Sequence, residues 1–340
     1  MNNKIKKINL NHSFIFFLLC NTFSVIAFKI TYFTISPFIC LLLILSIGVS
    51  HGSLDNLKGK KLFQIYGIDN FFIFYLSYVS ISLIIIILWV IIPSTSLIIF
   101  LIIASYHFGK EDTQFLIFKN SYLDHFLFFL KGSLIIFLIL ASFHFGKEDT
   151  QYLIVENSYY NQLLFFLKGS LIILAPMFFH FDETISIFKL LLIDNESFYK
   201  TLNFIEINKL ILFALILSTL SSILLFAKKF ELKKVTIFLD YFSILIINYY
   251  FSPLVAFTIY FCFLHSIRHS ITLMSELDKN DLRNGSKIFI KKAIPLTVLT
   301  ASFGLIGLYL LNYTYDLNSS ILKVVFICLA SLTFPHILLE

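Results

Sequence analysis

The sequence predicts an all-α fold, a polytopic membrane bundle of about ten transmembrane helices, in which residues 1–340 form a single domain. Its composition is 58% hydrophobic and only 14% charged, whereas soluble domains are about 45–50% apolar and about 25% charged. The 26 Lys and Arg residues lie in short clusters between apolar runs, as loop charges that orient membrane helices do. A water-soluble protein is excluded, and no nucleic-acid partner is expected.

Eleven apolar runs are the candidate helices, because a crossing of the bilayer takes about 20 apolar residues. The first follows the basic start MNNKIKK and is expected to be an uncleaved span, since no small-residue cleavage site ends it. Four polar segments separate later runs: a basic loop at 58–61, an amphipathic stretch at 185–193, a basic cluster at 228–234 and a polar loop at 275–292. The runs are residues 14–29, 33–49, 71–92, 96–108, 122–143, 160–179, 209–226, 235–250, 254–268, 289–311 and 321–337.

A tandem duplication interrupts this pattern. Residues 104–140 recur as residues 141–177 with about two thirds of the positions identical, beginning ASYHFGKEDTQ and ASFHFGKEDTQ. If both units crossed the membrane, every later basic loop would face outward. If the two repeat units together add only one crossing, the basic loops stay on the cytoplasmic side with the N-terminus. We therefore predict that one of the runs 122–143 and 160–179 does not span.

Histidines carry the strongest functional signal. Ionisable residues at membrane depth are costly and rare, so several at the ends of apolar runs need a common reason. Of the nine histidines, His12 and His125 look incidental, and His180 is ambiguous. The other six are His51 in GVSHGSLDN, His107 in ASYHFGKED, its copy His144 in ASFHFGKED, His265 and His269 in FLHSIRHS, and His336 in TFPHILLE.

The HSIRH segment predicts a metal site. Residues four apart on an α-helix share one face with Cβ atoms about 5–6 Å apart, so His265 and His269 can hold one ion. Neutral imidazole suits iron, copper, zinc or nickel. His51 and His107 would complete a four-imidazole set from separate helices. The four cysteines have no CxxC spacing and predict no thiolate site.

Carboxylates beside these histidines have two open interpretations. Asp55, Glu111 and Asp112 could accept the second imidazole N–H of a ligating histidine, which fixes its orientation. Equally, they could be solvated charges that pair with neighbouring lysines. His336 could be a further ligand, or could lie beside the ligands or the substrate channel.

The ordered motifs HGSLD, HFGKED, HSIRH and a late PH, spread over residues 33–340, resemble those of the Brp/Blh-type β-carotene 15,15′-dioxygenases. These are membrane enzymes found with microbial rhodopsins. The resemblance implies an Fe(II) enzyme that splits the central double bond of β-carotene with O2 into two molecules of all-trans-retinal. It implies His51, one of His107 and His144, and the pair His265 and His269 as iron ligands, with no other catalytic residue.

The same resemblance implies a location in the cell and a functional partner. Substrate and protein would share the lipid bilayer, with a functional link to a microbial rhodopsin. Together with the charge pattern, it predicts a multi-pass protein of the bacterial inner membrane, with the N-terminus and the metal site toward the cytoplasm.

This sequence departs from the family pattern because it has two HFGKED motifs where the family has one. His107 keeps the short spacing back to His51, whereas His144 keeps the short spacing forward to His265. We favour His107, since it reaches the side of His51 without the disputed crossing, but the sequence does not choose between them.

Three other functions are alternatives to this one. A di-iron desaturase or hydroxylase needs several HxxxH and HxxHH boxes, and this chain has one HxxxH and no adjacent histidine pair. A transporter with a histidine site would be built from long multi-span repeats, whereas the repeat here is the size of one hairpin. A carotenoid-binding or retinal-binding chaperone is the third alternative.

Overall fold

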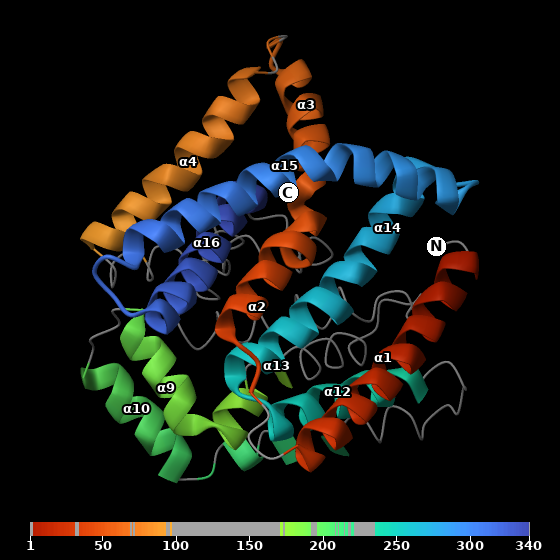
Figure 1. Cartoon of the computed structure of the whole chain (residues 1–340). Coiled ribbons are helices and arrows are strands. Elements are labelled where there is room, and N and C mark those ends of the chain that lie inside the picture. The colour runs from red at the N-terminus through yellow and green to blue at the C-terminus, as the bar shows by residue number, and fades with distance from the viewer. Residues whose placement is uncertain are drawn as a thin grey trace, which may run out of the picture. The chain divides into compact units, whose positions relative to one another are not determined.

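Helices form all of the regular structure in the described part of this computed structural model (Figure 1). The structure describes residues 3–30, 34–68, 70, 72–92, 96, 171–172, 174–191, 196–207, 209, 211–213, 215–216, 219–220 and 235–339. The first repeat unit and most of the second lie outside these residues, and so do the run 122–143 and residues 160–170 of the run 160–179. The prediction that one of those runs does not span therefore stays a prediction.

The chain divides into two compact units, which are treated separately below. The first unit comprises Met1–Ser36, Leu138–Lys189 and Asp194–His269, and the second comprises Pro37–Phe137, Leu190–Ile193 and Ser270–Glu340.

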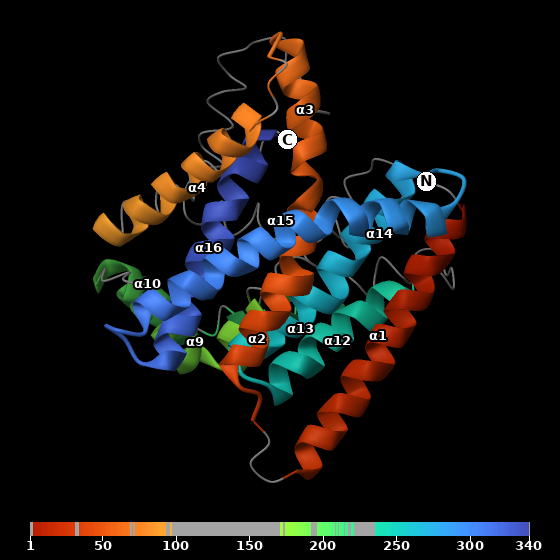
Figure 2. The same ribbon diagram turned by 45° about the horizontal axis from the view of Figure 1, so that its top comes forward.

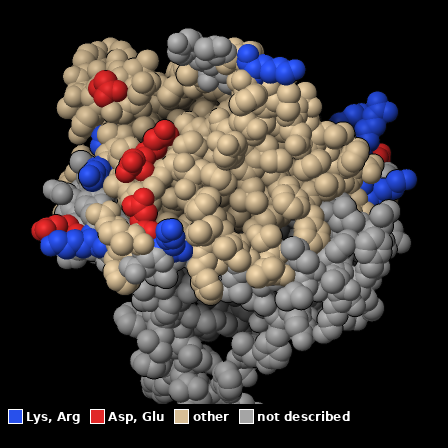
Figure 3. All heavy atoms as spheres, turned by 90° about the horizontal axis from the view of Figure 1, so that it is seen from below, with Lys and Arg blue, Asp and Glu red and all other residues tan. Residues whose placement is uncertain are grey.

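Four helices in the described residues are long and apolar enough to cross a membrane: Lys7–Lys29, Phe72–Ile91, Pro253–Leu277 and Leu282–Leu311. Pro37–Gly48 and Leu317–Leu332 are shorter apolar helices. The all-helical fold with several candidate membrane spans is thus confirmed in the described residues, while the count of about ten spans stays a prediction. In the view of Figure 3, the described part of the surface is largely uncharged, and its Lys, Arg, Asp and Glu side chains lie in small groups.

In the first unit, helix α1 (Asn3–Lys29) packs along α12 (Val235–Tyr250), as both ribbon views show (Figures 1 and 2). Phe16 and Cys20 of α1 and Tyr241 and Ile244 of α12 are buried. Pro253 then starts α13 (Pro253–Ile259) at its first turn, where the missing N–H costs nothing. The segment continues as the π-helix η5 (Tyr260–Ser266) and α14 (Ile267–Leu277), whose residues from Ser270 onward belong to the second unit.

Two amphipathic helices precede α12. Helix α9 (Phe181–Leu190) confirms the amphipathic stretch predicted at 185–193, although it begins and ends earlier. Asp182 and Glu183 lie in its first turn and Lys189 in its last, which suits the helix dipole. Helix α10 (Glu196–Ile207) carries an exposed ion pair in which Lys200 Nζ lies 2.8 Å from Glu196 Oε1.

The second unit contains α2 (Pro37–Leu43), the π-helix η1 (Ile44–Gly48), the 3-10 helix η2 (Val49–Leu54), α3 (Asp55–Ile65), α4 (Phe72–Ile91), α15 (Leu282–Leu311) and α16 (Leu317–Leu339). Helix α16 packs against α2, α3, α4 and α15, while α15 crosses η1 and η2 (Figure 2). Leu54, Leu273, Phe289 and Ala293 form a buried apolar cluster beside that crossing.

Two predicted loops are wrong, because both are largely helical. The basic residues 58–61 lie within α3, since lysine favours helices as much as loops. The segment 275–292 is mostly the end of α14 and the start of α15. Asp281 caps α15 by accepting the backbone N–H of Arg283 at 2.9 Å.

A short turn joins α14 to α15. The Asp278 carboxylate accepts hydrogen bonds from the Asn284 side chain and from the backbone N–H groups of Asp281 and Asn280, at 2.9, 2.9 and 3.0 Å. These donors hold the pKa of Asp278 below its ordinary value, because they stabilise the ionised carboxylate. The turn is thereby closed by polar contacts that charge counting along the sequence does not reveal.

Gly285 makes the turn possible, and its replacement by alanine is expected to destabilise the protein. A Cβ at Gly285 would lie 2.1 Å from the carbonyl oxygen of Met274, a backbone atom that cannot rotate aside. We expect Gly285→Ala to lower the free energy of unfolding by about 1–3 kcal/mol, as overpacking does.

The matched control is Gly307→Ala in the same helix, where the nearest atom, Val324 Cγ2, would be 3.9 Å away. This change should be neutral or slightly stabilising, since alanine favours helices over glycine. Thermal unfolding of the purified protein in detergent measures both variants, and equal shifts would contradict the close approach.

Candidate functional site

The helix that carries the HSIRH motif is the most buried of the four candidate spans. Of the most apolar stretch of 18 residues within Pro253–Leu277, 67% is buried. The corresponding share is 22% in Lys7–Lys29 and 11% in each of the other two spans. Both His265 and His269 lie in this continuous helical segment, as their spacing predicts. The histidine pair therefore belongs to an interior helix and not to a lipid-facing one.

A π-helical turn shapes this segment at His265. The turn spans Tyr260–Ser266 and so includes this histidine. Such turns are rare and are frequent at functional sites. The His265 side chain is 6% exposed, and its ring stacks on Phe261 at 5.9 Å between centroids and lies 6.1 Å from the Tyr260 ring. His269 is half-buried. The aromatic neighbours give His265 a dry and fixed environment.

Arg268, within HSIRH, forms a buried ion pair that the sequence analysis missed. Its Nη1 and Nη2 donate to Oδ2 and Oδ1 of Asp240, each at 2.9 Å. Both residues lie inside predicted apolar runs, 254–268 and 235–250. That position was an available signal, because opposite charges at membrane depth are expected to pair.

The HGSLD motif also lies where the helix is irregular. The π-helix η1 ends at Gly48, the 3-10 helix η2 carries the backbone of His51, and α3 begins at Asp55. The His51 side chain lies outside the described residues. Two of the predicted ligand segments, one in each unit, thus share a departure from α-helical geometry.

Asp55 is buried, with 4% of its surface exposed. The Tyr78 hydroxyl donates to its Oδ2 at 2.9 Å, and lies 3.4 Å from the Leu332 carbonyl oxygen. The alternative of a solvated loop charge is therefore wrong for Asp55, because burial and a tyrosine donor replace water. Its predicted role as the partner of a ligating histidine stays a prediction.

The remaining predicted site residues are not placed. His107, His144, Glu111 and Asp112 lie outside the described residues, and of His336 only the backbone, in α16, is described. Among the residues that the structure does describe, no three His, Cys, Asp or Glu side chains group as they would around a metal ion. The four-imidazole set therefore stays a prediction.

His180 has a structural role. Its Nε2 lies 2.8 Å from the backbone carbonyl oxygen of Asn248, and its Nδ1 lies 4.0 Å from Glu183 Oε1. An Nε2 that donates to this carbonyl is not itself free to bind a metal ion, and Nδ1 lies beside the Glu183 carboxylate. The histidine of the FFHFDE motif is thus a hydrogen-bonded residue that links its helix to the backbone at Asn248.

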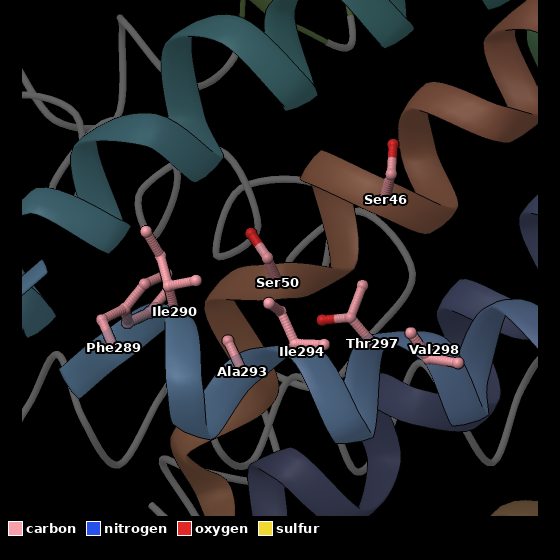
Figure 4. Close-up of a pocket in the computed structure, with 8 residues that line it drawn as sticks. All are labelled: Ser46, Ser50, Phe289, Ile290, Ala293, Ile294, Thr297 and Val298. Atoms are coloured by element: carbon pink, nitrogen blue, oxygen red, sulfur yellow. The ribbon is translucent and has the colours of Figure 1, made fainter. Parts of the chain in front are cut away.

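A small apolar pocket lies between α15 and the η1–η2 segment of the second unit (Figure 4). Its volume is about 190 Å³. The lining residues are Ser46, Ser50, Phe289, Ile290, Ala293, Ile294, Thr297 and Val298.

The hydroxyls around this pocket differ in their bonding. Ser46 donates to the Leu42 carbonyl at 2.6 Å and Ser50 to the Ile47 carbonyl at 2.7 Å, so both are committed to their own helix. The buried hydroxyl of Thr297 has no hydrogen-bond partner among the described residues. Ser50 directly precedes His51, so the pocket adjoins the HGSLD motif.

Comparison with known proteins adds two findings. A family model described as "Beta-carotene 15,15'-dioxygenase" matches residues 42–136 and 132–340, and the two matches meet inside the first repeat unit. A protein of uncultured marine bacterium 66A03, named "Beta-carotene 15,15'-dioxygenase", is 35% identical over 100 residues. That alignment covers 28% of this chain and 34% of the relative, so the chain spans about a third of the relative's length. No solved structure matches the chain.

Proposed function

Since this chain belongs to the β-carotene 15,15′-dioxygenase family, we propose that it splits the central double bond of β-carotene with O2. The bond breaks and each half gains one oxygen atom, which gives two molecules of all-trans-retinal. The observation that carries the proposal is the family match from residue 42 to the end of the chain. The four histidine motifs predicted membership of this family, and the family match confirms it.

We propose Fe(II) as the cofactor, held by His51, one of His107 and His144, and the pair His265 and His269. The support is the chemistry of the donors and the described pair: His265 and His269 lie on a largely buried helical segment, and His265 is buried beside aromatic rings. Iron, when bound, would supply the redox chemistry that O2 needs. The protein's own part is to orient the imidazoles and to exclude water.

The substrate is a long, rigid hydrocarbon that dissolves in the bilayer, and the protein offers it apolar surfaces. Five of the eight residues that line the pocket beside Ser50 are apolar, but the pocket is smaller than drug-sized ligand sites, which are about 300–1,000 Å³. We therefore propose that it receives one part of the polyene chain next to His51.

The carboxylates and the late histidine have supporting roles in this proposal. A ligating imidazole normally donates its second N–H to a carboxylate or a carbonyl. Asp55 is the described candidate, since it is buried four residues after His51 and is already held by Tyr78. Glu111, Asp112 and His336 are the further candidates from the sequence.

We also propose the setting. The lipid bilayer holds about ten spans, and the N-terminus and metal site face the cytoplasm of a bacterial inner membrane. Clusters of lysine and arginine between the apolar runs support this orientation. Retinal released there is available to a microbial rhodopsin, the functional link that the family resemblance implies.

The first test uses bacteria that accumulate β-carotene. Cells that express the wild-type chain should lose their orange colour and contain retinal. His269→Ala should lower retinal by more than about 100-fold, because losing a ligand costs more than the 10–100-fold typical of losing its hydrogen-bond partner. His180→Gln is the matched control: its amide can still donate to Asn248, so cells should bleach.

The amount of each protein in the membrane fraction, measured by immunoblot, normalises these yields. Orange cells with folded wild-type protein would refute the activity, and an unchanged yield from His269→Ala would exclude that residue as a ligand.

A second test separates the duplicated motifs. We expect His107→Ala to abolish retinal formation and His144→Ala to leave it unchanged, since His107 keeps the short spacing to His51. The reverse result would assign the ligand to the second copy. If neither single change lowers the yield, the double variant decides between two interchangeable copies, in which case retinal is lost, and a ligand elsewhere, in which case it persists.

A third test fills the pocket. Thr297→Phe should occupy the space beside Ser50 and lower retinal formation by about 10-fold, the loss expected when about 1.4 kcal/mol of favourable positioning is removed. Thr297→Val is the control, because it keeps the shape and removes only a hydroxyl without a partner in the described residues. Equal yields from both variants would show that the polyene does not use this pocket.

A further inference from the structure

The ion pair between Arg268 and Asp240 has the geometry of a fixed support. Two parallel bonds of 2.9 Å join the guanidinium to the carboxylate, and their side chains are 3% and 0% exposed. Paired charge-assisted bonds of this kind define both the distance and the plane of the two groups. Arg268 therefore cannot turn about its helix axis without breaking the pair.

A third helix is bound at the same point. The Nη2 of Arg268 also donates to the hydroxyl of Ser13 in α1, and that hydroxyl donates to the Asn9 carbonyl at 3.3 Å. Asp240 lies in α12 and Arg268 in α14, so three helices of the first unit meet at one guanidinium. Asp240 lies in α12, and α12 packs along α1. The position of the Asp240 carboxylate is therefore fixed by helix packing.

The position of Arg268 along its helix is informative. It follows His265 by three residues and directly precedes His269. The π-helical turn Tyr260–Ser266 comes just before it. Because such a turn accommodates one extra residue, the residues after it are rotated by about 100° relative to an uninterrupted α-helix. The direction of the His269 side chain therefore does not follow from the orientation of α13 alone.

We infer that the Arg268–Asp240 pair is a positioning device that holds the axial rotation of the HSIRH segment and thereby the direction of both imidazoles. The inference rests on the proposed function, because it takes His265 and His269 as metal ligands. A buried ion pair is seldom the most stable choice for a core, and holding one register is its best-supported use. Arg268 is then a positioning residue that does not touch the substrate.

The test measures metal binding and folding separately, with Co²⁺ as the probe. In the double variant Asp240→Leu/Arg268→Met both charges are removed together, and such replacements usually preserve or raise stability. We expect its metal-free form to unfold at a temperature equal to or above that of wild type. Its affinity for Co²⁺ should fall at least about 10-fold, with a changed visible absorption spectrum, because the imidazoles are no longer aligned.

Two further variants complete the design. Arg268→Lys keeps the opposite charge but cannot make two parallel bonds, so we expect an intermediate affinity. Glu196→Gln/Lys200→Gln removes an exposed ion pair, with side chains 82% and 73% exposed, and should bind Co²⁺ as wild type does.

The outcomes separate the two proposals. Wild-type Co²⁺ affinity in a folded double variant would overturn the positioning role and leave the proposed function standing. A wild-type protein that binds neither Co²⁺ nor Fe²⁺ would overturn both. If the double variant does not fold, Arg268→Lys decides, because full affinity in that variant would also overturn the inference.

Discussion

A charge at membrane depth must find a partner, and the first unit is arranged around this requirement. Lipid offers neither water nor counter-ions, so an unpaired guanidinium or carboxylate there is costly. Asp240 and Arg268 satisfy one another, and Ser13 brings α1 to the same point. The packing of α1 on α12, the burial of the Pro253–Leu277 span and the orientation of the HSIRH segment all meet at this contact.

In the second unit, buried charged side chains form hydrogen bonds with neutral groups. Asp55 is buried and accepts the Tyr78 hydroxyl, and buried Lys323 donates to the Leu190 carbonyl at 2.7 Å. Serine hydroxyls bond back to their own helices, as Ser46 and Ser50 do beside the pocket. The hydrocarbon substrate proposed for this protein is suited to surroundings in which serine hydroxyls are already engaged within their own helices.

Hydropathy was a good guide to helices and a poor guide to their ends. The run 235–250 coincides with α12, and the run 71–92 differs from α4 by one residue at each end. By contrast, α15 begins seven residues before the run 289–311. Its first two turns are polar and depend on the Asp281 cap and on the close approach at Gly285. Such contacts lie outside any count of apolar residues.

For the site, motif order predicted the family, and residue spacing placed His265 and His269 on one helical segment. The π-helical turns at Tyr260–Ser266 and Ile44–Gly48 were not predictable, because a π turn has no periodic sequence signature and depends on packing. The partner of Arg268 was in principle visible, since Asp240 is the sole acidic residue of the run 235–250.

The same ion pair bears on how the chain enters the membrane during synthesis. Only two residues separate α12, which carries Asp240, from the continuous helical span Pro253–Leu277, which carries Arg268, so the two helices are made in direct succession. Each of the two charged side chains is costly to place in lipid alone, whereas the pair carries no net charge. The two helices are therefore suited to leave the insertion machinery jointly, and a long spacer between them would delay neutralisation and favour their retention at the translocon.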